Sequence, residues 1–151
     1  MTDELRDLYQ EVLLDHHRRP RNFGKLKGAN RRADGYNPLC GDKVTVYLLV
    51  RGNVIEDIAF EGGGCAICTA SSSVMTELLK GKTETEVEKL FGQFRDLVTS
   101  EPHSEIDTET LGKLAVFAGV REFPLRIKCA TLAWHTLKAA LKGSSDPVTT
   151  E

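Results

Sequence analysis

The chain has 151 residues, of which 40% are hydrophobic and 28% charged, and its formal net charge is −2. This length suits one domain with its own core, and this composition excludes a strongly basic nucleic-acid-binding protein. No apolar run approaches the roughly 20 residues of a membrane helix, and the charged N-terminus is no secretory signal. We therefore expect a cytoplasmic protein with a single domain over residues 1–142 and a disordered tail over 143–151.

The first predicted elements are a helix and a hairpin. Apolar residues at helical spacing predict an amphipathic helix over 3–17, whose terminal His16 and His17 we expect to be solvated. The basic stretch 18–36 is expected to form a loop or an irregular strand. Residues 43–50 and 54–61 are rich in β-branched and aromatic side chains and are separated by a short turn, which predicts an antiparallel hairpin.

Helices dominate the rest of the chain. Three glycines lead into a predicted helix over 66–80, and a capping-box pattern from Thr83 to Glu86 opens the next one. Apolar periodicity predicts two more helices, over 107–118 and 129–141. A hairpin among these helices indicates the α+β class, with a small antiparallel β-sheet covered by helices.

The first chemical motif is a cysteine and an aspartate just before the hairpin. Cys40 and Asp42 flank Gly41, which allows both side chains to reach one ion from the same loop. A thiolate and a carboxylate side by side disfavour each other's ionisation, because both are negatively charged, unless a cation is present. The motif therefore suggests that Cys40 and Asp42 form part of a metal site.

The second motif is Cys65-Ala-Ile-Cys68, directly after the glycines. Cys65 falls near a predicted helix N-terminus, where unpaired N–H groups favour a thiolate. The alternative is that Cys65 is a small buried hydrophobic residue. The Cys-x-x-Cys spacing also suits a redox dithiol, although Cys68 lies a turn into the helix and equally suits the core.

Cys129 completes the candidate set. It is expected to open the last helix and so to share the electrostatic environment of Cys65. Three thiolates and one carboxylate from Cys40, Asp42, Cys65 and Cys129 suit a tetrahedral metal site, if the fold brings them together. His135 is expected to face away from such a site.

The sequence around these residues resembles the IscU/SufU family (NifU N-terminal-like) of iron–sulfur cluster assembly proteins. Four stretches carry the resemblance: Leu8–Gly24, Asn37–Asp42, Phe60–Lys82 and Arg126–Trp134. Within that family the chain is most similar to the SufU branch. The interval between the last two motifs is longer than in IscU-type chains, and Lys128 occupies the position where those chains have a histidine.

The resemblance implies an IscU/SufU-like fold and a Zn²⁺ ion held by Cys40, Asp42, Cys65 and Cys129. It further implies that Cys40 accepts sulfur as a persulfide from a cysteine desulfurase. Arg126 lies where it could steer an anionic persulfide. Cys68 departs from the serine-like residue usual in the SufU branch, which leaves a fifth-ligand or disulfide role open.

Three interpretations remain at this point. The protein is a zinc-dependent sulfur acceptor and partner of a cysteine desulfurase, or a non-enzymatic scaffold. The scaffold would carry a transient iron–sulfur cluster on the same cysteines and pass it to recipient apo-proteins. In the third interpretation zinc is only structural, but the amphipathic helices are numerous enough to fold without it. No nucleic acid or membrane partner is expected.

Overall fold

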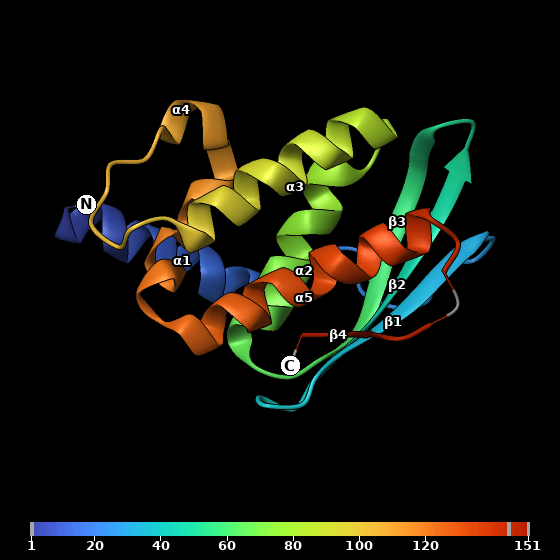
Figure 1. The fold of residues 1–151 in the computed structure, drawn as a ribbon, viewed down its shortest axis with the longest axis horizontal. Helices are drawn as coiled ribbons and strands as arrows, with labels where there is room; N and C mark the ends of the chain where they lie inside the picture. The colour runs from blue at the N-terminus through green and yellow to red at the C-terminus, as the bar shows by residue number, and fades with distance from the viewer. Residues whose placement is uncertain (1, 145, 151) are drawn as a thin grey trace.

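The computed structural model describes residues 2–144 and 146–150, and it confirms an α+β architecture (Figure 1). The helices are α1 (Asp3–Arg18), α2 (Ala66–Leu79), α3 (Glu84–Thr99), α4 (Thr108–Leu111), the 3₁₀ helix η1 (Gly112–Glu122) and α5 (Pro124–Leu141). The strands are β1 (Arg31–Asn37), β2 (Asp42–Arg51), β3 (Val54–Gly63) and β4 (Val148–Thr149). None of the helices in the described ranges is long and apolar enough to cross a membrane.

The four strands form one sheet in the order β3-β2-β1-β4. The predicted hairpin is confirmed, since β2 and β3 pair antiparallel with Val46 opposite Phe60. β1 adds a regular antiparallel strand where the sequence suggested only a loop or irregular strand. Its Gly35 obscured the strand pattern, yet this glycine is needed because a Cβ there would lie 2.0 Å from Thr136 Oγ1 on α5.

The C-terminal segment differs from the expected disordered tail at two positions. Val148 and Thr149 form β4, which pairs in parallel with Gly35 and Tyr36 of β1. The open edge of β1 offers unpaired backbone groups, and a β-branched residue such as Val148 is well suited to pair with them.

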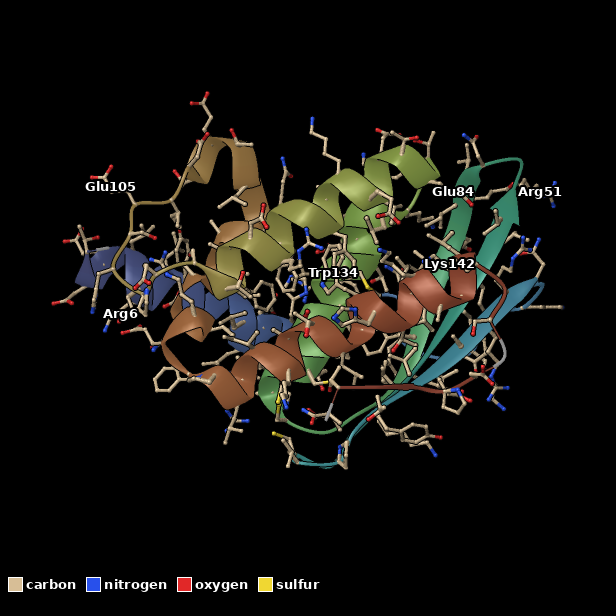
Figure 2. The ribbon with its side chains drawn as sticks, in the orientation of Figure 1. Arg6, Arg51, Glu84, Glu105, Trp134 and Lys142 are labelled. Carbon is tan, nitrogen blue, oxygen red and sulfur yellow. The ribbon has the colours of Figure 1, made fainter. Side chains whose placement is uncertain are left out.

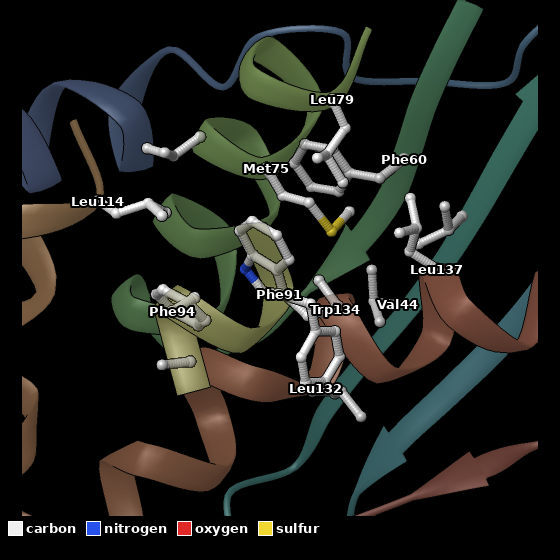
Figure 3. Close-up of a cluster of buried hydrophobic side chains, with 14 of the residues drawn as sticks. Val44, Phe60, Met75, Leu79, Phe91, Phe94, Leu114, Leu132, Trp134 and Leu137 are labelled. Carbon is white, nitrogen blue, oxygen red and sulfur yellow. The ribbon is translucent and has the colours of Figure 1, made fainter. Parts of the chain in front are cut away.

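α2 and α5 pack against one face of the sheet, and α3 covers the far side of α5 (Figure 1). The core between these layers is built from large apolar side chains that include Phe60, Met75, Phe94 and Leu137 (Figure 3). Trp134 projects from α5 into the interior of the molecule (Figure 2), and its ring stacks on that of Phe94 with centroids 4.9 Å apart. The core holds α2 and α5 in a fixed position beside the sheet.

Two helix boundaries differ from the sequence-based prediction. The last helix begins at Pro124, since Pro is well suited to the first helical position, and so Cys129 does not open it. The predicted helix over 107–118 is instead the short α4 followed by η1, with Gly112 at φ +55° between them. The capping box at Thr83 and Glu86 is confirmed.

Candidate metal centre

The loop between β1 and β2 carries Cys40 and Asp42. The Cys40 N–H donates to Asn37 O at 3.3 Å, and Gly41 adopts φ +71°, a left-handed conformation that glycine accepts without strain. The tight turn leaves Cys40 half-buried and Asp42, the first residue of β2, only 2% exposed. The thiol therefore remains partly accessible while the carboxylate is held inside.

The connection from β3 to α2 brings Cys65 against the same aspartate. Cys65 is the N-cap of α2, as the sequence predicted, and its N–H donates to Asp42 Oδ1 at 2.8 Å. This approach requires Gly64, because a Cβ there would lie 2.2 Å from Asp42 Oδ1 and 2.8 Å from its Cα. The glycines thus serve close packing on Asp42 as well as the turn.

Cys129 reaches the site from within α5. Its side chain is buried, and its thiol donates to the Leu125 carbonyl at 3.6 Å, one turn earlier in the helix. The expected stabilisation of a Cys129 thiolate by the helix N-terminus is therefore wrong. What positions this sulfur is the packing of α5 on the sheet.

The structure brings the predicted residues together. Ligand atoms of Cys40, Asp42 and Cys129 all lie within 4.8 Å of one another. The fourth residue lies next to this group, with Cys65 Sγ 3.9 Å from Asp42 Oδ2. All four cysteines of the chain are free thiols. That the four residues hold a metal stays a prediction.

Asn37 is a further residue of the site that the sequence analysis did not single out. It is fully buried at the end of β1, and its Nδ2 lies 3.3 Å from Asp42 Oδ2 and 3.5 Å from Cys129 Sγ. A polar residue at the start of the Asn37–Asp42 motif was the only signal available. Its amide supplies a donor to both the Asp42 carboxylate and the Cys129 sulfur.

The electrostatic environment of the site disfavours ionisation of Cys129. Burial raises the pKa of the Cys129 thiol above its ordinary value, and hydrogen bonding with Asp42, Cys40 and Cys65 raises it further. Arg126, which is exposed, contributes a nearby cation. Its hydrogen bond with Cys129 and the negative charge of Cys65 raise the pKa of its guanidinium.

The donor set fits a cation. Asp42 is buried, and none of the ion pairs among the described residues involves it. A buried carboxylate is costly unless it is paired or coordinates a metal. Three sulfurs and one oxygen are a donor set that suits a tetrahedral, borderline-soft ion such as Zn²⁺.

The remaining cysteine and the histidines lie outside this group. Cys68 is fully buried, and burial raises the pKa of its thiol. His135 contacts the Phe91 ring at 5.2 Å, away from the site. The expectation of a solvated His16 is wrong: it is 1% exposed, and its Nδ1 lies 2.7 Å from Ser73 Oγ on α2.

Fold and site together define a small α+β protein with a cysteine–aspartate cluster of metal-binding type at one end of its sheet. A family model described as the NifU-like N terminal domain matches residues 8–130. The IscU scaffold protein of Streptococcus pyogenes is 41% identical, covering 95% of this chain and 88% of its own. The zinc-dependent sulfurtransferase SufU of Bacillus subtilis is 39% identical over 87% of each chain.

This chain therefore belongs to the NifU-like N-terminal domain family, whose members named here are iron–sulfur cluster assembly proteins of the IscU and SufU types. A solved structure agrees with this. It is a candidate SUF-system cluster assembly scaffold from Fervidobacterium islandicum, with a TM-score of 0.79 and 36% identity, covering 93% of this chain and 99% of that chain. The family predicted from the sequence motifs is confirmed.

Proposed function

We propose that this protein accepts sulfur from a cysteine desulfurase for iron–sulfur cluster assembly, at a zinc site formed by Cys40, Asp42, Cys65 and Cys129. The observation that carries the proposal is the convergence of Cys40, Asp42 and Cys129 within 4.8 Å, with Cys65 hydrogen-bonded to the same aspartate. Bound Zn²⁺ would stabilise the Cys129 thiolate, which burial disfavours, as well as the other two thiolates of the set. Reduced thiols suit the cytoplasm, where we place the reaction.

Cys40 is the residue we assign to sulfur transfer. It is half-buried in a turn, whereas Cys129 is fully buried in a helix. The Cys40 thiolate attacks the terminal sulfur of the desulfurase persulfide, the S–S bond of that persulfide breaks, and the desulfurase thiolate leaves. Cys40 then carries the persulfide, and the exposed Arg126 cation beside the site is suited to attract its negative charge.

Exposed apolar side chains around the site support a docking partner. Leu39 precedes Cys40 and is 60% exposed, while Phe123 and Leu125 at the start of α5 are 59% and 61% exposed. Large apolar groups on the surface beside a functional residue are typical of an interaction site. A desulfurase that delivers sulfur to Cys40 must cover this surface.

The alternative function is a scaffold on which an iron–sulfur cluster is assembled and passed to recipient apo-proteins. The names of the similar IscU proteins favour it, and the same three cysteines would hold the cluster. In that case a reductant supplies two electrons to the persulfide sulfur, which becomes cluster sulfide and is not passed on as a persulfide.

One experiment separates the two functions. The zinc-loaded protein is incubated with a cysteine desulfurase and cysteine, with and without Fe²⁺, and the persulfide is located by mass spectrometry while metal content is followed. A persulfide on Cys40 with zinc retained supports transfer. Visible cluster absorbance with loss of zinc supports the scaffold. If neither the wild-type protein nor the Cys129→Ser variant carries a persulfide, and no cluster forms, both functions are rejected.

A further inference from the structure

The structure places Cys65 and Cys68 as a pair at the first turn of α2. Cys65 is the N-cap, Cys68 is the third residue of the helix, and the Cys68 N–H donates to Cys65 Sγ at 3.4 Å. A side chain at the N-cap that accepts from the third helical N–H is fixed over that residue. The first cysteine of the pair is therefore directed toward the second.

Backbone spacing permits a covalent bond between them. With a rise of 1.5 Å per residue and a radius of about 2.3 Å, helix positions three apart have Cα atoms roughly 5 Å apart. Disulfides join Cα atoms about 4.4–6.8 Å apart. The same Cys-x-x-Cys arrangement at a helix start is the one that redox dithiols use.

The two thiols differ in accessibility. Cys65 is half-buried at the site, whereas Cys68 is 0% exposed within the core. An oxidant in solvent therefore reaches Cys65 first. Cys68 lies behind it, protected from solvent and adjacent to the sulfur that is oxidised.

We propose that Cys65 and Cys68 form a reversible disulfide in response to peroxide, and that this disulfide removes Cys65 from the metal site. Peroxide transfers one oxygen to Cys65 sulfur, which gives a sulfenic acid and one water. The Cys68 sulfur then attacks Cys65 sulfur, the S–O bond breaks, and the oxygen leaves as a second water with the Cys68 proton. The two thiols lose two electrons, and a dithiol reductant returns them.

The consequence follows from the position of Cys65. Its sulfur lies 3.9 Å from Asp42 Oδ2, beside the group formed by Cys40, Asp42 and Cys129. A disulfide sulfur no longer offers a thiolate to the metal. This consequence rests on the proposed metal site, whereas formation of the disulfide depends only on the geometry of α2.

The pair is tested first in metal-free protein treated with one equivalent of hydrogen peroxide, followed by peptide mapping under non-reducing conditions. We expect Cys65 linked to Cys68 in at least a tenfold excess over other pairs. A bond from Cys65 to Cys40 or Cys129 in its place would overturn the proposal. Because no metal is present, this result is independent of the proposed function.

A matched variant provides the control. In Cys68→Ser the second thiol is replaced by a hydroxyl of similar size, in a helix where Ser71, Ser72 and Ser73 are already buried. We expect the sulfenic acid on Cys65 to persist and to be trapped by dimedone several-fold more than in wild type. Equal dimedone labelling in both proteins would refute a resolving role for Cys68.

Zinc affinity gives the second measurement. We expect the oxidised wild-type protein to bind zinc at least about tenfold more weakly than the reduced protein, with full recovery after dithiothreitol. Oxidised protein that contains the mapped disulfide but keeps its zinc affinity would show that Cys65 is not a ligand. That result would reject the consequence for the metal site and leave the disulfide itself established.

Discussion

Asp42 and Cys65 are joined by a hydrogen bond of 2.8 Å from the Cys65 N–H to Asp42 Oδ1. This bond links the first residue of β2 to the N-cap of α2, and Gly64 gives it the room it needs. Asp42 therefore has two roles, as a candidate ligand and as the residue that anchors the cysteine-bearing loop. The two roles can be separated by mutation.

We expect Asp42→Asn and Asp42→Ala both to weaken zinc retention, because each removes the anionic oxygen. Only Asp42→Ala leaves the Cys65 N–H without its acceptor, which costs about 1–3 kcal/mol. Chemical unfolding of the two metal-free variants should rank Asp42→Ala as less stable. In Asp42→Ala an assembled iron–sulfur cluster should also persist longer, because Asp42 is the hard oxygen ligand at which ligand exchange would begin. Unchanged zinc content and cluster lifetime in both variants would contradict the role of Asp42.

Gly64→Ala is expected to lower the free energy of unfolding by about 2–4 kcal/mol and to reduce zinc binding. The reason is the 2.2 Å approach of an added Cβ to Asp42 Oδ1, in addition to the φ of +152°. Gly28→Ala is the control, since Gly28 has φ +84° but nothing within 4 Å. It should cost only about 1 kcal/mol. Equal loss of zinc binding in both variants would show that close packing at Gly64 is irrelevant to the site.

Asn37→Ala should weaken zinc affinity by about 10–100-fold, because the amide supports both Asp42 and Cys129. Asn30→Ala is the matched control. Asn30 precedes β1, at the end of that strand remote from Asn37. Its Nδ2 donates to the carbonyl of Val50 on β2 at 2.7 Å, and its Oδ1 accepts from the Val50 N–H at 2.8 Å. It should destabilise the fold without changing zinc affinity, as measured by competition with a chelating dye. The same affinity loss in both would argue for a general effect of unfolding.

Because of the buried His16, the free energy of unfolding should fall as the pH decreases through the range just below 6.5. Burial lowers the pKa of His16 from 6.5, and the cations Lys113 and Arg21 lower it further, against the opposing effect of Glu77 and Asp15. Between the lowered folded-state pKa and the unfolded value, the unfolded chain binds more protons. The free energy of unfolding therefore rises with pH there and is lost on acidification.

The measurement is urea unfolding of metal-free protein across that range, for wild type and His16→Gln. Glutamine can still bond Ser73 but does not titrate, so the pH dependence should become weaker. It should not vanish, because burial also lowers the pKa of His135. If the free energy of unfolding of His16→Gln depends on pH as strongly as that of the wild type, other groups cause the pH dependence.

Removal of metal with a chelator should leave the protein folded. The main core, around Trp134, Phe94 and Phe60, is built from α2, α3, α5 and the sheet and needs no metal. We expect an unchanged far-UV circular dichroism spectrum and a lower melting temperature, since a ligand that binds only the folded state stabilises it. Loss of the helical signal on chelation would favour a purely structural metal.

Local sequence patterns determined much of the fold and named the candidate residues. Helical periodicity, the capping box at Thr83 and the β-branched hairpin depend on neighbouring residues, and the structure agrees with them. Cysteines at the Asn37–Asp42 turn and after the glycines are also local signals, as is the N-cap position of Cys65. Family motifs then linked these residues to one kind of protein.

Tertiary structure alone decided how those residues meet. Cys129 lies within α5 rather than at its start, and packing against the sheet brings its sulfur close to Cys40 and Asp42. The contact of Asn37 with Cys129 and that of the buried His16 with Ser73 were missed because the partners lie 92 and 57 positions away in the sequence. The sequence by itself determined which groups are available, while their distances depend on long-range packing that no local pattern encodes.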